Sequence, residues 1–233
     1  MALIDPLLLP PDYDSETYSR EPGHDGTDPH KPGYRRSWRG LIFVFRTGAS
    51  EPFASRLEAD AGRVLQARPE VVDLHRAPHS IEYRDGTRWR SYTPDWIVWT
   101  DDFSSPRVVE VKPEKKVIAK RAMLEAVTDA VHRTGSPFEV MSEQDIYRKN
   151  LFANSGAVCS AGRLQGLDAQ EVFRMAALLR ERESLRVTDV LDFGWRRSQA
   201  RDLLLHLAAW GRCVFDMSRP FHDRTVFVER TGR

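Results

Sequence analysis

Three charged side chains occur where two short apolar runs predict neighbouring strands. Asp95 opens the first run, DWIVW, while Glu110 and Lys112 close the second, VVEVK. Side chains two residues apart point to the same face of a strand, so Glu110 and Lys112 share one face. A turn in the intervening TDDFSS segment would bring Asp95 beside Glu110. The sequence therefore predicts two carboxylates and one ammonium that converge at a sheet edge.

Such a group is suited to bind a hard divalent cation. Two adjacent carboxylates repel each other, and their oxygen atoms are the ligands that Mg²⁺ or Mn²⁺ prefers. A bound ion can acidify a water molecule and stabilise charge on a phosphate, while Lys112 can position or deprotonate that water. The pattern also fits a plainer alternative. In that alternative, Glu110 and Lys112 are a surface pair on an edge strand and Asp95 is a turn residue.

The surrounding segments predict an α/β fold, with a mixed sheet flanked by helices in the order α-β-β-β-α-β. Arg39–Thr47 has the pattern of a strand, and the apolar spacing that follows predicts a helix capped by Ser50 and ended by Pro69. Residues 70–99 predict successive strands, with a hairpin turn at Asp85-Gly86. Residues 113–135 predict one helix, and residues 137–141 a final strand.

The last third of the chain predicts three helices followed by two strands, which is the order of a winged-helix domain. The helices begin near Asp168, at a Thr188 cap and around Arg197, and the second ends at Gly194. We therefore divide the chain into three parts. They are a Pro- and Gly-rich arm (1–34), a domain that holds the charged residues (35–150) and a winged-helix-like domain (151–233).

Composition narrows the class of protein without identifying a partner. The 233 residues are 41% hydrophobic and 30% charged, which is typical of a globular protein. No apolar run approaches the roughly 18 residues needed to cross a bilayer. The two cysteines, Cys159 and Cys213, predict buried free thiols and a cytoplasmic location. The net charge of +1 permits nucleic-acid binding but does not require it.

Basic side chains near the predicted site and in the third C-terminal helix are candidates for contacts with the DNA backbone. These residues are Lys115, Lys116, Arg196, Arg197 and Arg201. For each of them a solvated face, or a protein-docking role for the C-terminal domain, is the competing interpretation.

The spacing Pro94-Asp95…Glu110-x-Lys112 resembles the signature of the PD-(D/E)xK nucleases. A longer series of segments resembles the TnsA family, the endonuclease subunits of heteromeric cut-and-paste transposases. This series comprises FASRLEAD, ARPEVVDLHRAPHSIEYRDGTRWRSYTPDWIV, VVEVKPEKKV and FEVMSEQDI. The resemblance covers about residues 38 to 230 and implies a restriction-endonuclease-like core with a winged-helix-like second domain.

The resemblance also implies roles for individual residues. Glu58, Asp95, Glu110 and Lys112 would be catalytic, and the Val111 carbonyl would join the three carboxylates around Mg²⁺ or Mn²⁺. The implied activity is cleavage of the 5′, non-transferred strand at transposon ends in double-stranded DNA. The implied partners are a DDE-type transposase and an AAA+ ATPase regulator.

Two other functions fit the residues. One is a stand-alone PD-(D/E)xK nuclease in phage DNA processing or defence. The other is a non-catalytic DNA-binding assembly module that keeps the fold. Loss of strand cleavage on substitution of Asp95 or Lys112 would separate the enzymes from the assembly module.

Overall fold

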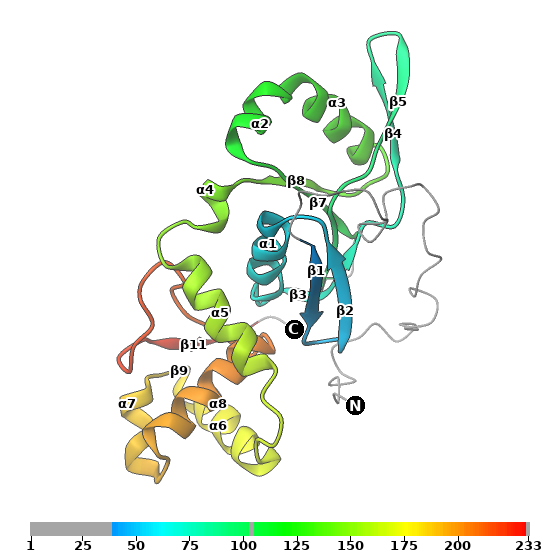
Figure 1. Cartoon of the computed structure of the whole chain (residues 1–233). Helices are drawn as coiled ribbons and strands as arrows, with labels where there is room; N and C mark the ends of the chain where they lie inside the picture. The colour runs from blue at the N-terminus through cyan, green and yellow to red at the C-terminus, as the bar shows by residue number, and fades with distance from the viewer. Residues whose placement is uncertain (1–38, 103–104, 232–233) are drawn as a thin grey trace. The chain divides into compact units, whose positions relative to one another are not determined.

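A computed structural model describes residues 39–102 and 105–231, which form a mixed α/β protein (Figure 1). The chain divides into two compact units. The first contains residues up to Leu65 together with Val71–Ile146, and the second contains Gln66–Glu70 and the residues from Tyr147 onward.

The predicted arm, residues 1–34, lies outside the described residues, as do residues 103 and 104 of the predicted TDDFSS turn. Among the helices that the structure describes, none is long and apolar enough to cross a membrane. Cys159 and Cys213 are buried and form no disulfide, as predicted.

A four-stranded mixed sheet forms the centre of the first unit. Its strands lie in the order β3 (Val71–Arg76), β6 (Trp96–Thr100), β7 (Arg107–Val111) and β8 (Phe138–Met141). Neighbouring strands are antiparallel except β7 and β8, which are parallel. Helix α1 (Arg56–Gln66) precedes β3, and helix α3 (Arg121–His132) connects β7 to β8. This sequence of elements confirms the predicted mixed sheet with helices.

Two hairpins accompany this sheet. One joins β4 (Ile81–Asp85) to β5 (Arg88–Tyr92), and Gly86 in its turn has the positive φ of 59° that favours glycine. The predicted turn at Asp85-Gly86 is therefore confirmed. The other hairpin pairs β1 (Gly40–Val44) with β2 (Ala49–Phe53).

The predicted helix start at Ser50 is wrong. Ser50 pairs with Phe43 across the β1–β2 hairpin, because Gly48, at φ 72°, turns the chain back on itself. The helix starts six residues later, at Arg56. Its first turn contains Glu58, whose backbone N–H donates to Ser55 Oγ at 3.2 Å. Ser55 therefore has the capping role that we predicted for Ser50.

The single helix predicted over residues 113–135 is divided into two. Helix α2 (Glu114–Ala119) buries none of its residues, whereas α3 buries an apolar face. Lys120, at φ −113° and ψ 19°, separates them. Only α3 is fixed by core packing, so the two segments need not share one axis.

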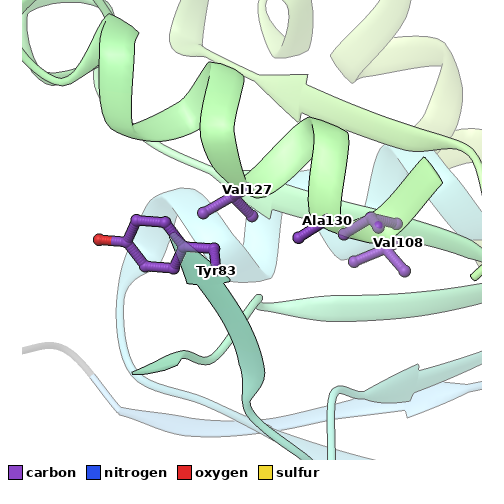
Figure 2. Packing of buried hydrophobic residues seen from close by; sticks show 5 residues of the cluster. Tyr83, Val108, Val127 and Ala130 are labelled. Carbon is purple, nitrogen blue, oxygen red and sulfur yellow. The ribbon is translucent and has the colours of Figure 1, made fainter. Parts of the chain in front are cut away.

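Helix α3 packs over β4 and β7 in the hydrophobic cluster of Figure 2. Val127, Ala130 and Val131 contribute the helix side of the cluster, and Tyr83 and Val108 contribute the strand side. Ile81 and Tyr92 pack against the same cluster. The β4–β5 hairpin is thus anchored to the sheet through the inner face of its strands.

The second unit contains helices and short strands. In chain order these are α5 (Leu151–Gly162), α6 (Ala169–Arg182), β9 (Ser184–Leu185), α7 (Val187–Val190), the 3-10 turn η1 (Leu191–Phe193), α8 (Arg197–Ala209), β10 (Cys213–Val214) and β11 (Phe227–Glu229). The strands form an antiparallel sheet in the order β10-β11-β9.

Most of the predicted C-terminal elements are present. The Asp168 side chain caps α6 by accepting from Gln170 N at 2.8 Å, and Gly194 ends η1 at φ 95°. The predicted Thr188 cap is wrong, because α7 begins at Val187 and Thr188 lies within its first turn. Helix α5 and strand β9 were not predicted.

Candidate active site

Asp95 lies where three strands of the sheet meet. Its backbone N–H donates to Val109 O at 3.2 Å, and its carbonyl accepts from Ala77 N at 3.1 Å. Its side chain turns towards the end of β7, where Asp95 Oδ2 accepts from Val111 N at 2.8 Å. The predicted placement of Asp95 beside Glu110 is therefore present, and backbone pairing on both sides fixes it.

Glu110 and Lys112 form an ion pair at the end of β7. Glu110 is only 1% exposed, and Lys112 is half-buried. Strand β7 lies between β6 and β8, so it is an interior strand of the sheet. The plainer alternative, a surface pair on an edge strand, does not fit this position.

Tyr92, the last residue of β5, completes the surroundings of Lys112. The Lys112 Nζ atom lies 5.2 Å from the centroid of the Tyr92 ring, a distance at which an aromatic face attracts a cation. The Tyr92 hydroxyl and Glu110 Oε2 are both buried without a hydrogen-bond partner. The two groups nevertheless lie close together, because hydrogen bonding from Tyr92 lowers the pKa of Glu110.

Glu58 approaches the same region from helix α1. Its Oε2 accepts from Ala54 N at 2.7 Å and lies 3.7 Å from Nη1 of Arg76 at the end of β3. Its charge nevertheless contributes to the pKa shifts of Asp95 and Glu110. The structure therefore places Asp95 and Glu110 together and Glu58 within electrostatic range of both.

The carboxylates of the site perturb one another. Burial raises the pKa of Asp95 well above its usual range, and the charges of Glu110 and Glu58 raise it further; the Val111 N–H and Lys112 oppose this shift. Burial also raises the pKa of Glu110, against the opposing effects of Lys112 and Tyr92. A proton or a cation bound beside these buried carboxylates would reduce the repulsion between their negative charges.

The donor set fits a hard cation, although no complete site is formed. Asp95, Glu110, Glu58 and the Val111 carbonyl supply only oxygen atoms, and Glu110 Oε2 is buried without a partner. Within residues 39–102 and 105–231, no three His, Cys, Asp or Glu side chains are grouped as a ready-made metal site. Glu58 is held by Ala54 and Arg76 instead, so it would have to shift to join an ion beside Asp95.

The predicted DNA-binding residues lie in two places. Lys115 and Lys116 are exposed on α2, which starts two residues after Lys112. Arg196, Arg197 and Arg201 lie at the start of α8 in the second unit. There, Arg197 and Arg201 form ion pairs with Asp223 at 3.4 and 3.2 Å, so part of their charge is already compensated.

Two residues near the site were not singled out from the sequence. Tyr92 contacts Lys112, and Arg76 contacts Glu58. The position of Tyr92 just ahead of Pro94-Asp95, at the end of an alternating strand, was the available signal. Nothing local to Arg76 distinguishes it from the other arginines, because its contact depends on how α1 packs on the sheet.

A second polar cluster lies on β2 and β3. His75 Nε2 lies 2.5 Å from Asp73 Oδ2, and His75 Nδ1 lies 3.3 Å from Glu51 Oε1. Burial alone would lower the pKa of His75, but the hydrogen bonds and charges of these two acids raise it to about 9. Glu51 also accepts from Arg76 N at 3.0 Å, so this cluster supports the strand end that contacts Glu58.

Comparison of the chain with protein-family models gives no match, and comparison with curated proteins gives none either. The assignment of function therefore depends on the geometry of this site and on the resemblance of its motifs.

Proposed function

We propose that this chain is a metal-dependent DNA endonuclease, which hydrolyses phosphodiester bonds at the ends of β6 and β7. The observation that supports this most directly is that Asp95, Glu110 and Lys112 lie close together at the ends of the adjacent strands β6 and β7. Buried carboxylates with raised pKa values beside a lysine have little structural benefit, but they suit phosphoryl chemistry.

Asp95, Glu110 and the Val111 carbonyl, with Glu58 after a shift of its side chain, are the groups that would hold Mg²⁺ or Mn²⁺. When bound, such an ion would acidify a water molecule and stabilise charge on the phosphate. The chain contributes the remaining functions. Lys112 is held beside Glu110 and over the Tyr92 ring, from which its ammonium can orient the attacking water or donate to a phosphate oxygen.

The fold supports a nuclease of the restriction-endonuclease-like class. The elements α1, β3, β6, β7, α3 and β8 run in the α-β-β-β-α-β order expected for that core, with the β4–β5 hairpin inserted after β3. In this arrangement the acidic residues lie at the ends of the two central strands, where the β6–β7 pairing fixes their separation.

The second unit supports a winged-helix-like domain. Its elements from α6 onward run helix, strand, helix, helix, strand, strand, and β9 pairs with the C-terminal strands. Together with the motif resemblance, this favours a TnsA-like subunit that cuts the 5′ strand at transposon ends. It would act with a DDE-type transposase and an AAA+ regulator.

The test is strand cleavage in the assembled system. Purified chain, transposase, regulator, end DNA and Mg²⁺ should produce nicks at the 5′ ends. The variants Asp95→Ala and Lys112→Ala should each lower the nicking rate by a factor on the order of 100 or more, the loss typical of removing a transition-state contact. Asp129→Ala is the matched control, because it removes an exposed carboxylate on α3. Full cleavage by the Asp95 and Lys112 variants would show that the assignment is wrong.

Metal binding gives a readout that does not depend on cleavage. Calorimetric titration of the full chain with Mg²⁺ should show binding that releases protons, because a cation beside Asp95 and Glu110 lowers their raised pKa values. Asp95→Ala should abolish the proton release, whereas Asp129→Ala should leave it unchanged.

A further inference from the structure

The β4–β5 hairpin has two chemically different faces. The cross-strand pairs Ile81–Tyr92, Tyr83–Arg90 and Asp85–Arg88 lie on one face, and the pairs Glu82–Ser91 and Arg84–Trp89 lie on the other. The first face packs on α3 and β7, as Figure 2 shows for Tyr83. The second face is turned away from that core, and Figure 1 shows the hairpin extending beyond the sheet beside α3.

The inner face makes the hairpin a fixed element of the first unit. Tyr83 is 5% exposed and contacts Tyr92 edge-on, with ring centroids 6.4 Å apart. The turn is closed by Gly86 at a positive φ. A ligand on the outer face would therefore meet a preorganised surface, which lowers the entropy lost on binding.

The outer face and the tip present an indole and two uncommitted guanidinium groups. Trp89 is 66% exposed, an unusual position for so large an apolar ring. Arg84 stands directly opposite it on the outer face, and Arg88 lies at the tip, where it pairs across the strands with Asp85 on the Tyr83 side of the hairpin. Within the part of the chain that the structure describes, the side chains of Arg84 and Arg88 have no hydrogen-bond or ion-pair partner, whereas the Arg90 side chain is paired with Asp85 at 2.7 Å.

The hairpin also leads directly out of the candidate active site. Strand β5 ends at Tyr92, whose ring contacts Lys112. Trp89 lies three residues back along the strand, a span of about 10 Å at 3.3 Å per residue, and on the opposite face of the hairpin from Tyr92. A polymer with a bond held beside Lys112 could therefore continue along this hairpin.

We propose that the β4–β5 hairpin binds duplex DNA flanking the scissile phosphate, with its outer face in a groove. Arg84 and Arg88 contact phosphates, and Trp89 packs against the sugars and base edges of the groove wall. This inference rests on the proposed nuclease function. A two-stranded ribbon fits the major groove, and the planar guanidinium group matches the geometry of a phosphate bidentately.

The experiment measures binding of the full chain to a fluorescent end-DNA duplex by anisotropy, in EDTA and over a range of salt concentrations. Each phosphate contact contributes about 0.9 to the slope of log K against log salt, so R84A/R88A should lower that slope by about 2. Trp89→Ala should weaken binding by about tenfold with an unchanged slope, because stacking and packing release no counterions. The control is D85A/R90A, which removes an exposed, already neutralised pair outside the Arg84–Trp89 face.

The outcomes separate this inference from the proposed function, because binding is measured without a metal and without cleavage. If Asp95→Ala still cleaves DNA but the hairpin variants bind less tightly, the catalytic assignment fails and the DNA contact is supported. Two results would overturn the inference. One is wild-type affinity and slope in both R84A/R88A and Trp89→Ala, which would instead indicate a protein partner for this face. The other is an absence of duplex binding by the wild-type chain at low salt.

Discussion

Replacing Lys112 by methionine tests whether the ion pair with Glu110 holds a buried charge in place. Methionine preserves most of the aliphatic volume, so the change removes the ammonium with little change in packing. The Glu110 side chain is 2% exposed, Lys112 Nζ bonds its Oε1, and its Oε2 has no hydrogen-bond partner. In the variant, Glu110 would therefore be a buried carboxylate without its cation.

The expected loss of unfolding free energy at pH 8 is about 3–5 kcal/mol, the cost of removing one partner of a buried pair. Glu110 can reduce this loss by binding a proton, and burial already raises its pKa. A carboxyl group whose pKa is higher in the folded state makes stability fall as the pH rises above its unfolded value of about 4.3. The loss should therefore be smaller at pH 5 than at pH 8.

The assay is urea unfolding followed by hydrogen exchange of peptides from β6 and β7, which reports on the first unit alone. Lys115→Met is the control, because Lys115 is exposed nearby and its loss should change stability by less than about 0.5 kcal/mol. The double variant E110Q/K112M should recover most of the loss, since a neutral amide replaces the unpaired charge. A loss below about 1 kcal/mol at pH 8, or one equal at both pH values, would refute this reasoning.

Three further predictions concern other polar groups. Asp95→Asn should raise the melting temperature of the metal-free chain at pH 8, because it removes a carboxylate whose pKa is raised by burial. The same variant should lose stabilisation by Mg²⁺, and scanning calorimetry with and without the metal measures both effects. The raised pKa of His75 contributes up to about 3 kcal/mol to the free energy of unfolding, which is present below pH 6.5 and is lost as the pH rises through about 9. His75→Asn should therefore make the free energy of unfolding less dependent on pH, measured by urea unfolding between pH 6 and 10. Asn154→Ala removes the donor to Met217 O (2.9 Å) and Arg219 O (2.7 Å), and it should destabilise the second unit by about 2–3 kcal/mol, measured by hydrogen exchange of peptides from α5 and α8.

The central part of the site could be predicted because it depends on local rules. Strand alternation places Glu110 and Lys112 on one face, and an antiparallel connection brings Asp95 to the end of β7. The same rules located the β4–β5 turn and the order of the sheet elements. Each of these predictions needed only neighbouring segments and their periodicity.

The remaining features depend on contacts between distant segments. Ser50 has a good capping side chain, but pairing between β1 and β2 determines its conformation, and the helix starts after Ser55. The break at Lys120 arises where core packing begins, since α3 buries its apolar face and α2 buries nothing. The contact of Tyr92 with Lys112 likewise depends on how the inserted hairpin packs on the sheet.

The balance of charges favours the proposed enzyme over an assembly module that only keeps the fold. For stability alone, an amide side chain at Asp95 would be preferable, because burial raises the pKa of this carboxyl and an amide oxygen can still accept from the Val111 N–H. One lysine faces this group, and an acceptor oxygen of Glu110 stays buried without a partner. A cation would remove the repulsion between these carboxylates. The same charges that weaken the metal-free fold are thus the ones that a nuclease requires, which is why Asp95→Asn should raise the stability of the metal-free chain and abolish its binding of Mg²⁺.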